Sequence, residues 1–129
     1  MIIQIIGLPG SGKTTLAEEL SNRINGFHIN ADKVRQGINS DLGFEPKDRV
    51  EQARRMGCLA RLVEDQGLIA VVDFVCPTQQ TREAFGFADV VVWVDRIKEG
   101  RFEDTNKLWE DPLKYDIKIA EGKTVDEEV

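Results

Sequence analysis

Residues 7–15 read G-L-P-G-S-G-K-T-T and follow directly on the almost wholly apolar residues 2–6. The pattern G-x-x-x-x-G-K-[ST], placed between a predicted strand and a predicted helix, is typical of a loop that binds a phosphate chain. Its glycines allow backbone angles and a close approach that turn several N–H groups toward one anion. We therefore predict an ATP-binding loop made of Gly7, Leu8, Pro9, Gly10, Ser11, Gly12, Lys13, Thr14 and Thr15.

Two side chains of this loop are suited to chemistry on the phosphates. Lys13 would reach the β- and γ-phosphates of ATP as a point charge, and it is therefore a catalytic candidate. The Thr14 hydroxyl would bind a Mg²⁺ ion that bridges the same phosphates. A glycine-rich turn that carries a lysine by chance is the alternative. The complete motif in its correct strand-to-helix context argues against it.

Composition is typical of a small cytoplasmic enzyme. The chain has 129 residues, of which 41% are hydrophobic, so it can bury one core, and residues 1–129 are expected to form a single domain. No apolar stretch is long enough for a membrane span. Cys58 and Cys76 are too few for a disulfide framework and are expected to be reduced and packed. The net charge of −6 argues against an extended nucleic-acid surface.

Hydrophobic periodicity alternates between strands and helices along the chain. A helix follows the loop and should end at Asn25-Gly26. Strands are expected at 2–6, 27–29, 68–72, 89–94 and 115–119, and further helices at 46–66 and 78–85. This order predicts a three-layer α/β fold with about five mostly parallel strands and with helices on both faces, and it places strand 2–6 near the centre.

Two carboxylates follow buried strands. Asp32 lies just beyond strand 27–29, where it would receive the proton of an acceptor hydroxyl and lie near the metal, although a helix-capping role is the alternative. Asp73 ends strand 68–72 and would orient the magnesium shell, unless it only caps the following turn. His28 is the only histidine. We interpret it as structural, because a catalytic or metal-binding histidine needs partners.

Several segments together resemble the adenylylsulfate kinase family of phosphate-loop kinases. They are the loop itself, N-A-D-K-V-R-Q-G-I-N-S-D-L-G-F at 30–44, D-R-V-E-Q-A-R-R at 48–55 and F-V-C-P at 74–77. The D-x-x-R-x-G-x-N-x-D-L-G-F stretch is far more specific than the loop. The resemblance implies transfer of the γ-phosphate of ATP, with Mg²⁺, to the 3′-hydroxyl of adenosine 5′-phosphosulfate.

The resemblance also implies roles for individual residues. Asp32 would lie beside the metal and the acceptor hydroxyl, Arg35 and Arg49 would bind the phosphosulfate, and Phe44 would face its adenine. Gln52, in the D-R-x-E-N motif, would belong to the same acceptor site. Phe102, in the segment F-E-D-T-N-K-L-W-E-D-P, would lie on the other side of the adenine. Planar, permanently charged guanidinium groups suit a dianionic phosphosulfate.

The chain departs from the family's usual pattern at several positions. Asn30-Ala31-Asp32-Lys33 stands where the family usually has Asp-Gly-Asp-Asn, and Gln52 replaces an asparagine. Cys76 replaces the usual serine, and Asp73 stands where a small neutral residue is common. By comparison with the family, residues 95–112 are expected to form a reduced lid region with positive charge from Arg96, Lys98, Arg101 and Lys107, and residues 121–129 an acidic tail. A homodimer is a further expectation from the resemblance.

Three functions are therefore compared. The first is a compact adenylylsulfate kinase that binds ATP and a small nucleotide acceptor. The second is a kinase for another hydroxyl, such as a polynucleotide 5′-end or a small metabolite, which the single aspartate after the second strand and Asp73 favour. The third is a nucleotide-binding protein with little catalysis, suggested by the short lid.

Overall fold

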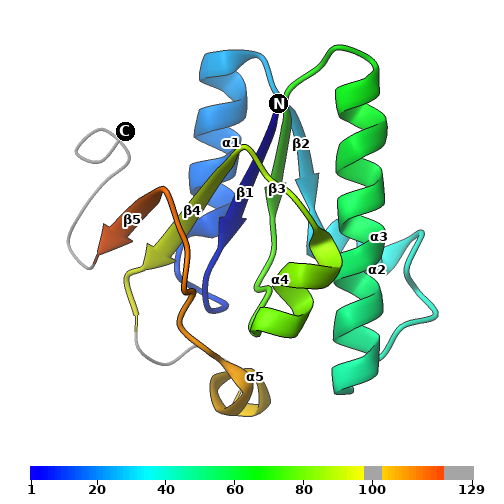
Figure 1. The fold of residues 1–129 in the computed structure, drawn as a ribbon, viewed down its shortest axis with the longest axis vertical. Helices are drawn as coiled ribbons and strands as arrows, with labels where there is room; N and C mark the ends of the chain where they lie inside the picture. Colours follow the sequence, from blue (N-terminus) through cyan, green and yellow to red (C-terminus); the bar gives the residue numbers. More distant parts are fainter. Residues whose placement is uncertain (98–102, 121–129) are drawn as a thin grey trace.

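The structure is a computed structural model in which residues 1–97 and 103–120 are described. Its centre is a five-stranded sheet in the order β2-β3-β1-β4-β5, and every strand pair is parallel. The predicted α/β class and the central position of the first strand are therefore confirmed (Figure 1). The strands are β1 (Ile2–Ile6), β2 (Phe27–Asn30), β3 (Ala70–Asp73), β4 (Val90–Asp95) and β5 (Ile117–Ala120).

Helices cover both faces of the sheet (Figure 1). The helix α1 (Lys13–Ile24) packs on one face, where Leu16 and Ala17 are buried against Ile3 and Ile5. The helices α3 (Pro46–Asp65) and α4 (Gln79–Phe85) pack on the other, with Met56 among the core residues. Every residue of β1 is buried, including Gln4 at its centre, which fits a largely apolar strand covered on both sides.

Local capping explains where the helices begin and end. Asn25 closes α1 in the left-handed conformation with φ 54°, and its N–H donates to Ser21 O. Pro46 opens α3, and Glu45 and Asp48 form a capping box around it. Thr78 caps α4 in the same way. These boundaries confirm the predicted helices to within one or two residues.

Two short helices were not predicted. They are α2 (Ala31–Gln36) and α5 (Glu103–Leu108), each six residues long. Asn30 caps α2 by accepting from Lys33 N at 3.0 Å. Segments this short carry too few residues for a helical period to be recognised. Both lie at the carboxyl ends of the strands, where the loop from β1 to α1 also lies (Figure 1).

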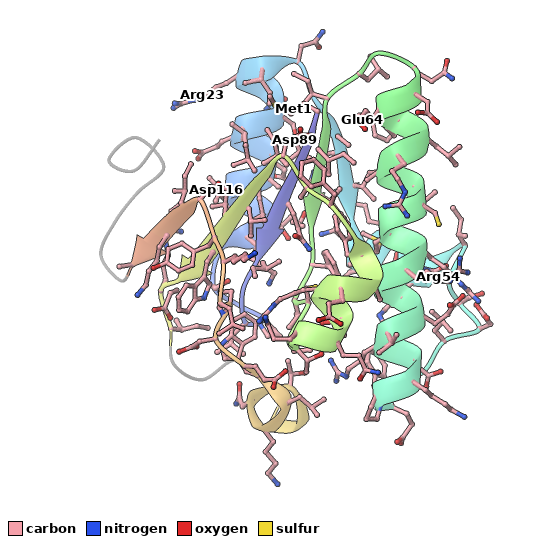
Figure 2. The ribbon with its side chains drawn as sticks, viewed as in Figure 1. Met1, Arg23, Arg54, Glu64, Asp89 and Asp116 are labelled. Carbon is pink, nitrogen blue, oxygen red and sulfur yellow. The ribbon has the colours of Figure 1, made fainter. Side chains whose placement is uncertain are left out.

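The opposite end of the sheet is held by ionic and polar contacts of the chain's first residues. The amino group of Met1 lies 2.8 Å from Glu64 Oε2, and Ile2 N donates to Asp89 Oδ2 at 2.7 Å. These side chains gather at the end of the molecule far from the phosphate loop (Figure 2). Among the described residues, no helix has both the length and the apolar character to cross a membrane.

We predict that Gly57→Ala destabilises the fold by about 1 to 3 kcal/mol through overpacking. A Cβ at position 57 would lie 2.1 Å from Phe85 O, so α3 and α4 would have to separate. Alanine has the higher helix propensity, which makes a net loss diagnostic of the clash. Urea denaturation measures the change. Leu62→Ala, at a 62% exposed position of the same helix, is the control and should change stability by less than about 0.5 kcal/mol.

Candidate active site

The phosphate loop is shaped by glycines at two points of constraint. A Cβ at Gly7 would lie 2.6 Å from Val94 O of the neighbouring strand β4. Gly12, the N-cap residue of α1, has φ 96°, which side chains rarely adopt. Lys13 is buried, and its Nζ donates to Leu8 O at 3.1 Å across the loop. The loop therefore turns directly from the central strand into the positive end of α1.

The buried carboxylate of Asp73 joins the loop to the ends of β2 and β3. It is 2% exposed, and its Oδ1 accepts from Thr14 Oγ1 at 3.1 Å and from Asn30 Nδ2 at 3.1 Å. The sheet register pairs Asn30 with Asp73, and Asp73 in turn with Ile5 of β1. Parallel pairing thus brings three separate parts of the chain to one point.

His28 is a partner of this carboxylate, since its Nε2 contacts Asp73 Oδ2. The sequence interpretation had left His28 without partners, and in that respect it was wrong. A single histidine within a strand gives no sequence signal for this contact, because only the register between β2 and β3 brings His28 and Asp73 together. Asn30 was likewise noted only as a departure from the family pattern.

The oxygens around Thr14 and Asp73 fit a magnesium ion. Mg²⁺ prefers oxygen ligands and is usually bound by one or two protein groups together with substrate phosphates. Among the residues that the structure describes, no cluster of three or more His, Cys, Asp or Glu side chains could hold a metal by itself. A hydroxyl and a carboxylate beside a phosphate loop are therefore the appropriate donor set for a metal that arrives with a nucleotide.

A cleft of about 900 Å³ opens beside the loop, on the side of β2 and β3. Gly12, Lys13 and Thr14 form one wall and Asp73 with Cys76 part of the floor. Asp32 projects from the first turn of α2 as an exposed side chain lining the same space. The two predicted carboxylates thus lie in one cavity, Asp73 buried and Asp32 accessible.

Opposite the loop, two arginines flank an exposed aromatic ring. Phe44 is 66% exposed, and the guanidinium carbons of Arg35 and Arg49 lie 4.5 and 5.8 Å from its ring centroid. Arg35 Nη1 donates to Gly43 O at 2.8 Å and Arg49 Nε to Phe44 O at 2.9 Å. Burial, and then the neighbouring charge of Arg49, lower the pKa of Arg35. The two arginines therefore concentrate positive charge at one face, and a bound anion would reduce the repulsion between them.

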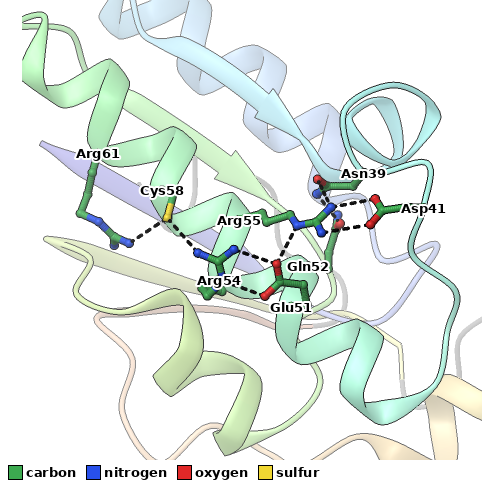
Figure 3. Close-up of polar contacts among 8 residues, drawn as sticks. All are labelled: Asn39, Asp41, Glu51, Gln52, Arg54, Arg55, Cys58 and Arg61. Atoms are coloured by element: carbon green, nitrogen blue, oxygen red, sulfur yellow. Dashed lines mark hydrogen bonds and ion pairs between the residues drawn. The ribbon is translucent and has the colours of Figure 1, made fainter.

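A polar network on α3 fixes the connection that carries this face (Figure 3). Arg55 forms a bidentate pair with Asp41 at 2.8 and 3.0 Å and also donates to Asn39 Oδ1. Asn39 is fully buried and donates to Gln52 Oε1 at 2.7 Å. Hydrogen bonds from Arg54 and Arg55 lower the pKa of Glu51 to about 2, which keeps this carboxylate ionised. Gln52 lines the cleft, with its amide oxygen already bonded within this network.

The helix α5 reaches the same cleft from the far end of the chain. Thr105 is buried, lines the cleft and accepts from Arg49 Nη2 at 3.3 Å. The sequence analysis did not select Thr105, because a lone threonine in a charged segment gives no signal. Phe102, the predicted second aromatic, lies outside the described residues, as do Lys98 and Arg101.

The thiols behave as the sequence predicts. Both cysteines are free, with Cys76 buried and Cys58 partly exposed. Burial raises the pKa of Cys76 to about 12, so its thiol stays neutral in the floor of the cleft. Gln4 donates to its sulfur at 3.7 Å and Thr81 Oγ1 lies 3.5 Å away, which holds the side chain in place.

Comparison with known proteins places this chain in a family. A family model described as adenylylsulphate kinase matches residues 1–92. Adenylyl-sulfate kinase 3 of Arabidopsis thaliana is 42% identical over 88 residues, and an adenylyl-sulfate kinase of Vibrio vulnificus is 44% identical over 87. Each match covers 64% of this chain and 42% of the relative. The chain therefore spans about two fifths of the length of these curated relatives.

Solved structures share the fold over nearly the whole chain. The APS kinase CysC of Mycobacterium tuberculosis, in complex with AMPPNP and APS, superposes with a TM-score of 0.83. The match covers 98% of this chain and 91% of that one at 22% identity. A shikimate kinase of Aquifex aeolicus gives a TM-score of 0.58 at 19% identity, with 98% and 90% of the two chains covered. At these identities the likeness shows a phosphate-loop kinase fold.

Lys13→Ala should abolish most of the stabilisation that Mg-ATP gives the folded protein. A ligand at a hundred times its dissociation constant adds about 2.7 kcal/mol to the free energy of unfolding. Loss of the Lys13 charge removes a partner of the phosphates, so the melting temperature of the variant should barely respond to the nucleotide. Differential scanning fluorimetry measures both shifts. Lys114→Ala, at an exposed position, is the control, and an equal response in both variants would remove Lys13 from the binding model.

Proposed function

Because the chain belongs to the adenylylsulphate kinase family, we propose that it transfers the γ-phosphate of ATP to the 3′-hydroxyl of adenosine 5′-phosphosulfate. The observation that carries this proposal is the Arg35–Phe44–Arg49 face across the cleft from the phosphate loop. It offers an aromatic surface and two planar cations within one short stretch. That combination suits a small anionic nucleotide better than the end of a polymer.

On the donor side, the loop residues 7–15 bind the phosphates of ATP through their backbone amides. Lys13 leaves the Leu8 carbonyl to reach the β- and γ-phosphates. Thr14 and Asp32 would hold Mg²⁺, which would neutralise charge on the phosphates, and Asp73 would orient this shell through the hydrogen bond that it accepts from Thr14. His28 and Asn30 keep the Asp73 carboxylate turned toward Thr14.

On the acceptor side, Asp32 guides the proton of the attacking hydroxyl. Its carboxylate is exposed to the cleft, while Asp73 is enclosed by hydrogen bonds. A proton acceptor must touch the substrate, and of the two carboxylates only Asp32 is accessible for that contact. Arg35 and Arg49 bind the phosphosulfate, Phe44 stacks on the adenine, and Gln52 and Thr105 complete the wall behind them.

We further propose that residues 1–129 act as one catalytic domain in which residues 95–112 serve as a reduced lid. Arg49 already contacts Thr105 of α5, so acceptor binding and the position of this lid segment are linked through one hydrogen bond. Phe102 would then supply the second aromatic surface for the adenine. The homodimer and the cytoplasmic location expected from the sequence stay predictions.

Asp32→Asn should lower turnover about a hundredfold or more while leaving Mg-ATP binding largely intact, because the amide keeps the shape and loses the basic oxygen. Steady-state rates at saturating acceptor, together with ATP-induced melting shifts, separate the two effects. Asp65→Asn, at the exposed end of α3, is the matched control. Wild-type turnover in Asp32→Asn would move proton handling to another group, with Asp73 next to be tested.

The acceptor itself is tested by transfer of labelled γ-phosphate to adenosine 5′-phosphosulfate, to a 5′-hydroxyl oligonucleotide and to water alone. We expect label on the phosphosulfate only. Arg49→Ala should lower kcat/KM by a factor that corresponds to about 1.5 to 3 kcal/mol of lost transition-state stabilisation, because charge-assisted hydrogen bonds are lost.

Arg54→Ala is the matched control for Arg49→Ala, since Arg54 lies on the same helix, faces solvent and pairs with Glu51 (Figures 2 and 3). It should leave kcat/KM unchanged. Label on the oligonucleotide and none on the phosphosulfate would favour a polynucleotide kinase. Label on neither, despite ATP binding, would favour a nucleotide-binding protein with little catalysis.

A further inference from the structure

Arg96 approaches the phosphate loop from the side opposite the acceptor cleft. It follows directly on β4, which pairs with β1 on the edge away from β3. Its Nη1 lies 2.8 Å from the point that a Cβ of Gly12 would occupy. The proposed acceptor cleft is lined by the loop, the ends of β2 and β3 with the segment after β3, the helices α2 and α3 with their connection, and Thr105 of α5, and no residue of β4 lines it. The guanidinium and the cleft therefore lie on two sides of the same loop.

The surroundings of this guanidinium are already positive. Gly12 is the N-cap of α1, where the helix dipole presents partial positive charge, and the adjacent Lys13 adds a full charge. The first turn of α1 contains no acidic residue. The carboxylate next to Arg96 in the chain, that of Asp95, has its Oδ2 3.6 Å from Lys118 Nζ of β5. A guanidinium at the positive end of a helix is favourable when an anion lies between them.

One hydrogen-bond donor of Arg96 has no acceptor among the described residues. Its Nε is buried, and within residues 1–97 and 103–120 it has no hydrogen-bond partner. A buried donor without an acceptor is costly, and native structures keep such groups where a ligand or a function requires them. These observations place a partly buried guanidinium, with one unpaired donor, beside the positive end of α1 and the phosphate loop.

We propose that Arg96 is a donor-binding residue whose guanidinium contacts the phosphate chain of the nucleotide from the β4 side of the loop. This inference rests on the proposed function in one respect, namely that the loop binds a nucleoside triphosphate. With the proposed acceptor on the β2–β3 side, the remainder of the donor would extend past Gly12 toward the carboxyl end of β4, which Arg96 follows. A permanently charged planar fork is well matched to phosphate oxygens. Arg96 thereby supplies, from one residue after a strand, a contact that a longer basic lid would otherwise provide.

The test is equilibrium binding of Mg-ATP and of magnesium tripolyphosphate, without any acceptor, to Arg96→Ala, Arg96→Met and Arg96→Lys. Methionine keeps an apolar stem in place of the arginine chain, so it separates loss of the guanidinium from loss of packing. We expect Arg96→Ala and Arg96→Met to raise the dissociation constants of both ligands by the same factor, about tenfold to a hundredfold. Arg96→Lys should recover part of the loss. The melting temperature of the ligand-free variants should not fall, because removing a buried donor that has no acceptor removes a cost to the folded state.

Arg23→Ala is the matched control, since this substitution removes the same charge at the far end of α1 from Gly12 (Figure 2). It should bind both ligands like the wild type. Unchanged or tighter binding in Arg96→Met would overturn the proposal, and tighter binding would mean that Arg96 occupies the nucleotide's place. Loss of ATP affinity with unchanged tripolyphosphate affinity would also overturn it, because the contact would then be to the nucleoside.

The outcome is separable from that of the proposed function. Failure of phosphosulfate phosphorylation leaves these binding constants unaffected, since no acceptor is present. Wild-type ATP binding in Lys13→Ala would refute the donor site as a whole, whereas wild-type binding in Arg96→Met alone would refute only the role of Arg96.

Discussion

The arrangement of the site depends on one buried carboxylate. Asp73 accepts hydrogen bonds from Thr14 of the loop and Asn30 at the end of β2, and it contacts His28 within β2. A carboxylate that is 2% exposed is tolerable only when its oxygens are occupied. Its partners are therefore structural supports of the loop as well as neighbours of the proposed metal. Removal of one partner would leave charge unsatisfied at the centre of the sheet edge, so the loop, β2 and β3 are coupled through this group.

The proposed acceptor face, formed by Arg35, Phe44 and Arg49, is held in place by a separate polar network. The guanidinium of Arg55 pairs with Asp41, and the buried Asn39 links the same connection to Gln52 (Figure 3). Gln52 Nε2 in turn donates to Ala31 O at 3.4 Å. An exposed connection between two helices would otherwise be among the least ordered parts of a small protein. Here the network fixes it at both ends, and Phe44 can remain exposed between its two arginines. Preorganised cations and an aromatic surface reduce the entropy lost when a small ligand binds.

The phosphate loop separates these two regions. The groups proposed to bind the acceptor come from β2, α2, α3 and the end of β3, whereas Arg96, which follows β4, lies on the other side of Gly12. The parallel sheet makes this division possible, because strands on either edge of β1 deliver their carboxyl ends to opposite sides of one turn. In the proposed reaction, the donor and the acceptor of the phosphoryl group would meet in line at that point. Thr105 extends the acceptor side to α5 and so connects it to the segment that follows β4.

The sequence alone determined the fold class, the phosphate loop and most helix boundaries, because these follow from local glycines, caps and hydrophobic periods. It also selected Arg35, Phe44 and Arg49, since a specific short motif carries them. The contacts of His28 with Asp73 and of Arg49 with Thr105 join residues 45 and 56 positions apart. No local pattern encodes them, since they depend on strand register and on how α5 packs. The sequence analysis named Arg96 as one of the charges of a reduced lid, and only the pairing of β4 with β1 brought it to Gly12. Local chemistry thus determined which groups are present, and tertiary packing decided which of them meet.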